Sequence, residues 1–396
     1  MPDYSYYRNQ LRGLKLPAAF VDLDLLDHNI QQILQRAGEL PIRIASKSVR
    51  CCHVLRHILS ASKQFRGLMT FSVDEALYLV EQGFDDLLMG YPETHPDRLA
   101  ALVSANRRGA TIVPMVDCEK HMELLNAQAI KQQYVQPICV DVDMSSEFPM
   151  VYFGTYRSSI NSVAKFKEFL EHLKRYPGLK LEGIMGYEAQ IAGVGEQNPF
   201  SGKLMGAVIR QLKNRSIPEL TSRRQQCVQL AKEAGHDLRL VNGGGTGSIR
   251  STKQDSSVTE ITVGSGFYCP GLFDYYRDFR FQPAAGFALE ITRQPRAGMF
   301  TLAGGGYIAS GSISLDKRPL PYLPNGIQLI ANEGTGEVQT PIKFSGSEEL
   351  AIGDPVLFRH AKAGELCERF NELHLIRLGH VVQSVPTYRG HGRCFL

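Results

Sequence analysis

Short apolar runs alternate with segments of helical periodicity from about residue 18 to about residue 265. The first run, at residues 18–24, leads into a segment in which Leu26, Ile30, Ile33 and Leu34 recur at helical spacing. Strands that alternate with helices predict a parallel sheet joined by right-handed crossovers. Eight further apolar runs lie at residues 42–46, 67–71, 86–90, 111–116, 137–143, 181–187, 238–242 and 260–264.

The eight runs after residue 41 are enough to close a barrel. Helical patterns separate them, as at residues 73–84 and 223–235, where Gly235 is typical of a helix end. Eight strand–helix units at this length favour an α/β fold of the closed (β/α)8, or TIM barrel, type. An open doubly wound sheet is the structural alternative.

The pattern changes after about residue 270. Glycine-rich turns at residues 304–307 and 332–337 separate short runs that are typical of antiparallel strands. Four such runs lie at residues 288–294, 301–305, 327–331 and 354–360.

The chain of 396 residues is too long for one ordinary core. We therefore expect a barrel domain over residues 17–270 and a C-terminal antiparallel β domain over residues 271–396. Residues 1–16 precede the barrel strands, and we expect this N-terminal segment to join the β domain.

Composition and charge narrow the class of protein. The chain is 43% hydrophobic and 21% charged, with a net charge of +4, and its basic residues are scattered rather than clustered. A nucleic-acid partner is therefore not indicated, whereas a small anionic ligand fits.

The location of the protein is indicated by its cysteines and its apolar segments. The eight cysteines include no CxxC pair, which favours reduced thiols. No apolar run approaches the roughly 20 residues that span a bilayer, and the first 17 residues lack the apolar core of a secretory signal. We expect a cytoplasmic protein without a membrane partner.

Lys47 is the first candidate for chemistry. It follows the run at residues 42–46, so it lies at the C-terminal end of the first barrel strand, on the face of Arg43 and Ala45. Active sites of such barrels lie at that end, and a lysine amine can form a Schiff base with a carbonyl. A solvated lysine at a strand end is the alternative, and it is the common case for a lysine taken alone.

Two glycine-rich loops follow the last two predicted strands. The first, at residues 241–248, contains Gly243, Gly244, Gly245 and Thr246, and the second spans residues 264–268. Glycine lets backbone N–H groups approach a phosphate, and barrels often bind phosphate beside their last two strands. A turn without a ligand is the alternative for each loop. The dinucleotide-binding pattern fails because Ser248 stands where its last glycine is needed.

Four further positions have little meaning alone. Asp141 and Asp143 share a strand face, but no histidine lies near them in the sequence, which favours a simple strand-end pair over a metal site. Arg157 is compatible with a surface arginine, and Tyr187 with a half-buried tyrosine at a strand end.

Several of these stretches together resemble a known family. PAAFVDLDLLDHNI (17–30), RIASKSVR (43–50) and FSVDEALYLVEQGFDDLLMGYP (71–92) are similar to the alanine-racemase-like enzymes of fold type III, which use pyridoxal 5′-phosphate (PLP). Within that group the chain resembles the D-threonine aldolase and D-serine dehydratase branch. The resemblance covers nearly the whole chain.

The resemblance implies a role for each candidate residue. Lys47 would bear PLP, Arg157 would contact the oxygen side of the PLP ring, and Tyr187 would face that ring. The loops would bind the cofactor through Gly243, Gly244, Gly245, Thr246, Gly266, Phe267 and Tyr268.

The C-terminal domain departs from the family pattern. The branch has a divalent-metal pair in the region that matches residues 352–370, but Lys362 and Gly364 stand at those two positions. His360, Glu365 and Cys367 lie close by and offer a displaced metal site. We favour another hypothesis, in which no metal is bound and the Lys362 ammonium supplies the positive charge beside a substrate hydroxyl.

The resemblance favours a PLP-dependent lyase that acts on a D-amino acid with a 3-hydroxyl group, by aldol cleavage or by dehydration. Lys47 would then act as a general base. An amino-acid racemase is the first alternative, although no opposing tyrosine is evident in the β domain. A non-catalytic PLP-binding protein is the second, and the long β domain argues against it. The family also implies a homodimer and a small-molecule amino-acid substrate.

Overall fold

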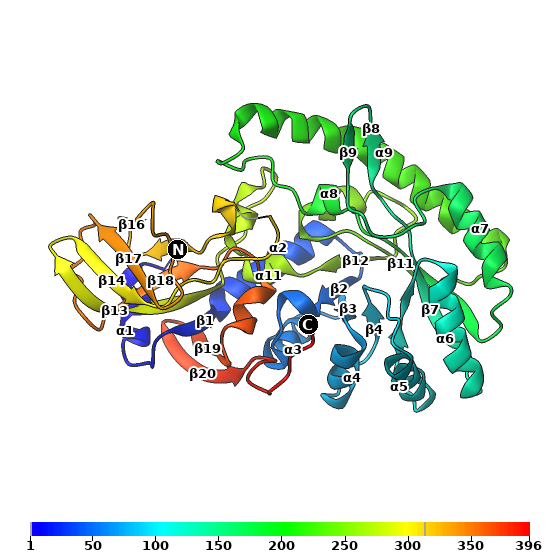
Figure 1. Cartoon of the computed structure of the whole chain (residues 1–396), viewed down its shortest axis with the longest axis horizontal. Helices are drawn as coiled ribbons and strands as arrows, with labels where there is room; N and C mark the ends of the chain where they lie inside the picture. Colours follow the sequence, from blue (N-terminus) through cyan, green and yellow to red (C-terminus); the bar gives the residue numbers. More distant parts are fainter. Residues whose placement is uncertain (1, 313) are drawn as a thin grey trace.

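The computed structural model describes residues 2–312 and 314–396. It contains two large sheets that lie beside each other, and each belongs to a separate part of the molecule (Figure 1). The parallel sheet, with β2, β3, β4 and β7, lies on the right of the view. The antiparallel strands β13, β14, β17 and β18 lie on the left.

The parallel sheet closes on itself. Its last strand pairs with its first, because Ile261, Thr262 and Val263 lie in parallel register with Ile42, Arg43 and Ile44. All its neighbouring strands are parallel, which confirms the predicted α/β fold with a TIM barrel. The barrel strands are β2 (Ile42–Ala45), β3 (Phe65–Thr70), β4 (Leu87–Met89), β5 (Ile112–Val113), β6 (Met115–Val116), β7 (Gln136–Asp141), β10 (Leu179–Gly186), β11 (Leu240–Gly243) and β12 (Glu260–Val263).

The run predicted at residues 111–116 forms two short strands. Pro114 separates β5 from β6, and its missing N–H interrupts the ladder. β5 pairs with β4 on one side, while β6 pairs with β7 on the other. The two segments therefore occupy one strand position of an eight-stranded barrel.

Helices cover the outside of the barrel. α2 shows why they form where they do, because the Asp22 carboxylate caps its first turn by accepting from the N–H groups of Asp24 and Leu25 at 3.0 and 3.1 Å. The apolar side of α2 packs into the core through Leu26, Ile30 and Ile33. The barrel helices are α2 (Leu23–Ala37), α3 (Cys52–Ser60), α4 (Val73–Glu81), α5 (Pro96–Arg107), α6 (Glu119–Lys131), α7 (Val163–Leu173) and α9 (Gly202–Glu233).

α9 is much longer than the helix predicted at residues 223–235. Its first half has exposed apolar side chains, Leu204, Met205 and Val208, so no buried stripe marks this half in the sequence. The remaining elements of the barrel part are short: β8 (Ser146–Phe148), β9 (Val151–Phe153), α8 (Ala189–Ala192), α10 (Ile249–Thr252), α11 (Ser265–Tyr268), η1 (Ser46–Ser48), η2 (Thr246–Ser248) and η3 (Gly271–Tyr275).

The second part is the predicted antiparallel β domain, which confirms the expected architecture. Its core packs Phe287 against Phe358, with ring centroids 5.5 Å apart. Its elements are β13 (Ala285–Arg296), β14 (Met299–Ala303), β15 (Leu320–Leu323), β16 (Ile327–Leu329), β17 (Gln339–Phe344), β18 (Pro355–Arg359), β19 (Glu372–Arg377), β20 (His380–Pro386), η4 (Leu315–Lys317) and η5 (Gly364–Glu368).

The N-terminal part of the chain also packs on this domain. β1 (Ala18–Asp22) pairs antiparallel with β13 and parallel with β19, so these residues lie in the β sheet and not in the barrel range where we placed them. All five residues of β1 are buried, as in a barrel strand, so the apolar run alone did not reveal that β1 pairs with β13 and β19. α1 (Tyr4–Leu11) precedes it, and the Tyr4 hydroxyl donates to the Pro355 carbonyl at 2.8 Å. Exact domain boundaries stay a prediction.

Among the helices described, none combines the length and the apolar character that a membrane crossing requires.

Candidate active site at the barrel rim

A cavity of about 800 Å³ opens where the C-terminal ends of the barrel strands face the β domain. Barrel residues on its wall include Lys47, Tyr91 and Tyr187, while Lys362 and Ser310 come from the β domain. The C-terminal rim is where barrels of this type carry their chemistry. This volume suits a ligand the size of a small cofactor together with a small substrate.

Lys47 lies on η1, directly after β2, at the predicted rim. The turn is held against the neighbouring strand β3, because the Ser46 hydroxyl donates to the Met69 carbonyl at 2.8 Å. The Lys47 side chain is half-buried and lines the cavity, where its amine donates to the Tyr91 hydroxyl at 2.7 Å. The structure therefore presents a nucleophilic amine to an enclosed space.

Tyr91 is a site residue that we did not predict. It follows β4, so the strand-end argument that selected Lys47 would also have selected Tyr91. Burial favours the neutral phenol, but the Lys47 charge, the hydrogen bond from Lys47 and the Arg157 charge outweigh it. Together they hold the pKa of Tyr91 below its ordinary value. The Tyr91 phenol therefore loses its proton more readily than an ordinary tyrosine.

The two glycine loops meet at the cavity. Gly244, Gly245 and Thr246 line it, and the Thr246 hydroxyl accepts from the Gly266 N–H at 3.1 Å, which ties the two loops together. A Cβ added at Gly245 would lie 2.9 Å from the Ala192 Cβ. This loop position must therefore stay without a side chain.

Some of the predicted loop residues do not line the cavity. Gly243 lies at the end of β11, and Gly266, Phe267 and Tyr268 lie within α11. The Phe267 ring packs 5.9 Å from that of Phe65, and the Tyr268 hydroxyl donates to the Val49 carbonyl at 3.1 Å. The residues of this second loop on the cavity wall are Gly264 and Ser265.

Arg157 and Tyr187 both line the cavity, and their contacts with a cofactor stay a prediction. The Arg157 guanidinium carbon lies 5.4 Å from the Tyr187 ring centroid and 6.0 Å from that of Tyr91. This arrangement places one cation over two aromatic rings. Lys47 completes the group, with its amine 5.3 Å from the Tyr91 ring centroid.

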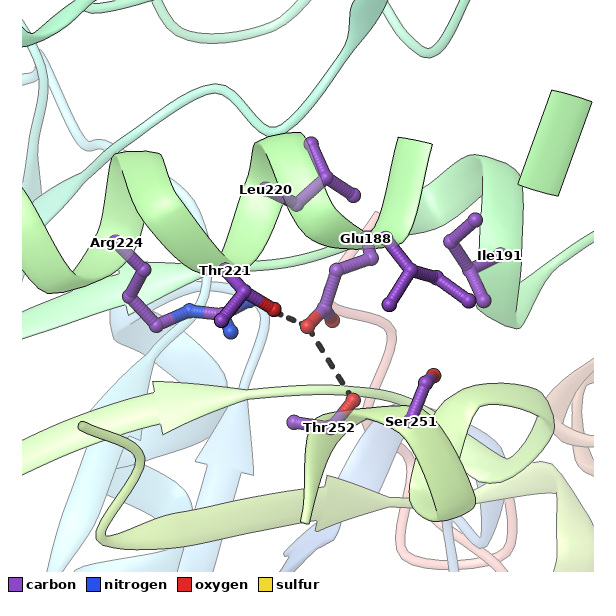
Figure 2. Close-up of a pocket in the computed structure, with 8 residues that line it drawn as sticks. Glu188, Ile191, Leu220, Thr221, Arg224, Ser251 and Thr252 are labelled. Atoms are coloured by element: carbon purple, nitrogen blue, oxygen red, sulfur yellow. Dashed lines mark hydrogen bonds and ion pairs between the residues drawn. The ribbon is translucent and has the colours of Figure 1, made fainter. Parts of the chain in front are cut away.

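A buried charge network lies behind the first glycine loop (Figure 2). The Glu188 carboxylate accepts from the Gly244 N–H at 2.7 Å and from the Thr252 hydroxyl at 3.3 Å. It also forms an ion pair with Arg224 on α9, which binds Asp255 at 2.6 Å. Glu188, Arg224 and Asp255 are all buried, so this network fixes the loop backbone from the side away from the cavity.

Asp141 and Asp143 do not form a metal site together. The Asp143 carboxylate accepts from the N–H and the hydroxyl of Ser145, at 2.9 and 2.7 Å. Burial and the charges of Asp117 and Asp143, opposed by Arg157, raise the pKa of Asp141 to about 7. Within the described ranges, the chelating group close enough for a metal is Asp117, Cys118 and His121, and these residues do not line the cavity.

The alternative of a displaced metal site rests on three residues, and the structure shows how each of them is placed. His360, Glu365 and Cys367 do not bring their ligand atoms together among the described residues. The Glu365 carboxylate binds the N–H and the hydroxyl of Ser310, and the Cys367 thiol donates to the Val49 carbonyl at 3.2 Å. Glu365 and Cys367 are therefore directed to different neighbours, and neither ring nitrogen of the buried His360 has a hydrogen-bond partner among the described residues.

We predict that His360 makes the protein sensitive to acid. Burial lowers the pKa of His360 to about 3, so the folded protein keeps it neutral. The unfolded chain takes up a proton near pH 6.5, and stability is therefore lost as the pH falls from about 6.5 toward 3, by about 1.4 kcal/mol per pH unit. In urea unfolding between pH 7.5 and 5, His360→Phe should lose less stability than the wild type. Substitution of the exposed His380 by Phe is the control, and equal slopes for His360→Phe and wild type would contradict the prediction.

Solved structures of known enzymes share this fold. The D-threonine aldolase from Filomicrobium marinum superposes with a TM-score of 0.79 at 16% identity, covering 96% of each chain. The D-threo-3-hydroxyaspartate dehydratase from Delftia sp. HT23 gives 0.75 at 17% identity, covering 96% of this chain and 98% of the other. The alanine racemase from Bacillus anthracis with bound L-Ala-P gives 0.66 at 16% identity, covering 96% and 99%.

No curated protein matches this sequence. The family model described as alanine racemase, N-terminal domain, matches residues 21–270, which include every barrel strand. This match and the shared fold confirm the resemblance inferred from the sequence. The chain therefore belongs to the alanine racemase N-terminal domain family, whose members use PLP.

Proposed function

We propose that this chain is a PLP-dependent lyase that acts on a D-amino acid carrying a 3-hydroxyl group. One observation carries the proposal: the Lys47 amine, the glycine loops and the Lys362 ammonium all line one cavity. The names of the D-threonine aldolase and the D-threo-3-hydroxyaspartate dehydratase, which share the fold, support this substrate class.

The residues on the cavity wall fit PLP. Lys47 supplies the amine that would hold its aldehyde carbon, and the loops at Gly244–Thr246 and Gly264–Ser265 would receive its phosphate. The Tyr187 ring supplies an aromatic face, and Arg157 a positive charge. When bound, PLP supplies an electron sink for the bonds to the substrate Cα.

Side chains on the cavity wall would carry out the proton transfers. Lys47, once its amine is free, is placed to take a proton from Cα, and Tyr91 orients that amine through the 2.7 Å hydrogen bond. The β domain faces the barrel rim and contributes part of the cavity wall. Lys362 and Ser310 provide polar groups for the substrate hydroxyl.

Product analysis tests this function against its alternatives. Protein loaded with PLP should be given D-threonine, D-serine and D-threo-3-hydroxyaspartate, with their L-enantiomers as controls. A lyase gives glycine and an aldehyde, or a 2-oxo acid and ammonium. Accumulation of the enantiomer alone would indicate a racemase, and PLP binding without any product would indicate a non-catalytic protein.

We predict that Glu188 determines PLP affinity without touching the cavity. Glu188→Ala removes the acceptor of the Gly244 N–H and leaves Arg224 with Asp255 as its remaining carboxylate. The loop should lose its fixed geometry, and PLP should bind about 10-fold more weakly or worse, which is about 1.4 kcal/mol. Absorbance titration with PLP measures this. Substitution of the exposed Glu233 by Ala is the control, and unchanged affinity in Glu188→Ala would refute the positioning function.

We also propose a homodimer, which the resemblance implies. The exposed apolar side chains at the start of α9, Leu204, Met205 and Val208, support a second copy as the partner. Sedimentation velocity should give a dimer for the wild type and a shift toward monomer for Leu204→Glu. A cytoplasmic location stays a prediction.

A further inference from the structure

The segment that follows β18 places Gly364 against the Lys47 turn and carries Lys362 on the wall of the same cavity. Gly364 packs so closely that an added Cβ would overlap the Lys47 carbonyl oxygen and lie 3.0 Å from the Arg50 Nε. That oxygen is already held in place, because Arg50 donates to it at 2.9 Å. A metal-binding side chain therefore cannot stand at position 364 unless Lys47 moves.

The divalent metal of the related branch does not fit these residues. A lysine ammonium has no lone pair for a metal, and glycine offers no side-chain ligand. The nearby His360, Glu365 and Cys367 do not converge, as described above. The charged side chains that this segment places on the cavity wall are Lys362, a hydrogen-bond donor, and Glu365, whose carboxylate already accepts from the N–H and the hydroxyl of Ser310.

Among the described residues, two N–H groups of the Lys362 ammonium have hydrogen-bond partners and the third has none. Its amine donates to the Ser310 carbonyl at 2.7 Å and to the Ser310 hydroxyl at 3.2 Å, and an ammonium has three N–H groups. Glu365 fixes Ser310 in turn, because its carboxylate accepts from the N–H and the hydroxyl of Ser310. Within residues 2–312 and 314–396, Lys362 has no carboxylate at ion-pair distance, whereas Lys317 on the same wall is paired with Asp316 at 3.0 Å.

We infer that the enzyme works without a divalent metal and eliminates water from its substrate, with Lys362 as the acid that protonates the leaving 3-hydroxyl. This inference rests on the proposed function. A protonated lysine can donate to a departing oxygen, but it cannot accept the hydroxyl proton that aldol cleavage must remove. The cation in this place therefore favours dehydration over aldol cleavage.

The proposed elimination conserves all atoms and electrons. Lys47 takes the Cα proton, and the electron pair of that bond forms the Cα–Cβ double bond. The Cβ–O bond breaks, its electron pair leaves with the oxygen, and a proton from Lys362 completes a water molecule. The unsaturated amino acid that is released takes up one water and yields a 2-oxo acid and ammonium. Lys47 releases the Cα proton to solvent, and Lys362 takes up a proton from solvent, so both residues return to their starting states.

Metal content and products test the inference on the PLP-loaded enzyme. We expect far less than one Zn, Mn or Mg per chain by elemental analysis of the His121→Ala variant, which lacks the chelating group of Asp117, Cys118 and His121 outside the cavity. Calorimetric titration of the same variant, free of PLP, with Mn²⁺ or Zn²⁺ should show no binding. The activity should be unchanged by EDTA, with 2-oxo acid and ammonium as products. Stoichiometric metal that the activity requires would overturn the metal-free part, and glycine with an aldehyde would overturn the dehydration.

Lys362 itself is tested by Lys362→Met, with the exposed Lys343→Met on β17 as the control. Lys362→Met should lower kcat about 100-fold or more while the absorbance of bound PLP stays as in the wild type. It should also weaken binding of D-threonine, but not of D-2-aminobutyrate, which lacks the hydroxyl, as read from the absorbance change of bound PLP. Equal effects on both ligands would overturn the assignment. If no 3-hydroxy amino acid is turned over at all, the proposed function fails, while the metal measurements still decide the metal part.

Discussion

Replacement of Lys47 by alanine will abolish turnover. We expect a loss of about 1,000-fold or more, because the same amine holds the cofactor and moves the Cα proton. The visible absorbance of protein-bound PLP should disappear as well. Borohydride reduction of the wild type, followed by peptide mass analysis, should locate the pyridoxyl group on Lys47.

The effect on stability should be small by comparison. Lys47 is half-buried, and its side chain is held by one hydrogen bond, to Tyr91. Its removal should cost about 1 kcal/mol of unfolding free energy. The exposed Lys63→Ala variant is the matched control, and a small primary amine added to Lys47→Ala should restore part of the activity. Turnover within a few-fold of wild type in Lys47→Ala would refute both the cofactor site and the proposed function.

The barrel could be predicted because its strands are short, buried apolar runs between amphipathic helices. β1 shows the limit of this argument. Ala18–Asp22 is as apolar and as buried as a barrel strand, yet it pairs with β13 and β19, which lie more than 250 residues away in the sequence. Hydrophobic periodicity predicts that a strand is buried but does not specify its neighbours, since pairing depends on contacts between distant segments.

In the candidate site, too, some residues could be predicted from the sequence and others could not. Lys47, Arg157, Tyr187, Thr246 and Lys362 reach the cavity from positions that the sequence suggested. Tyr91 was missed although it too follows a strand. The sequence does not show that the fold places this tyrosine beside Lys47.

The positioning residues were harder to predict. Glu188 lies between β10 and α8, and it binds Arg224 on α9 and the Gly244 N–H of the glycine loop. As ordinary charged residues in the sequence, Glu188 and Arg224 do not reveal that they are buried. Local sequence signals therefore recover strand ends and glycine loops, whereas partners brought together by the fold require the structure.

Gly364→Ala should be the most damaging substitution for the fold of the site. The added methyl group would overlap the Lys47 carbonyl oxygen, which is backbone and cannot turn aside as a flexible side chain can. Overpacking of this kind costs about 3 kcal/mol or more of unfolding free energy when the neighbours cannot yield. Gly13→Ala is the matched control, because nothing lies within 4 Å of a Cβ at that position.

The two possible responses of the protein to Gly364→Ala can be told apart. If the β domain and the Lys47 turn are held rigidly together, urea unfolding will show the full loss of stability. If η5 withdraws from η1 instead, stability will be kept, but Lys47 will lose its support and PLP will bind more weakly by absorbance titration. Arg50 gives a reason to expect the first response, because it donates to the Lys47 carbonyl and also pairs with Glu368 on η5, which ties both segments to one side chain. A variant with both wild-type stability and wild-type PLP affinity would show that position 364 can hold a side chain, and the steric argument against a metal ligand there would fail with it.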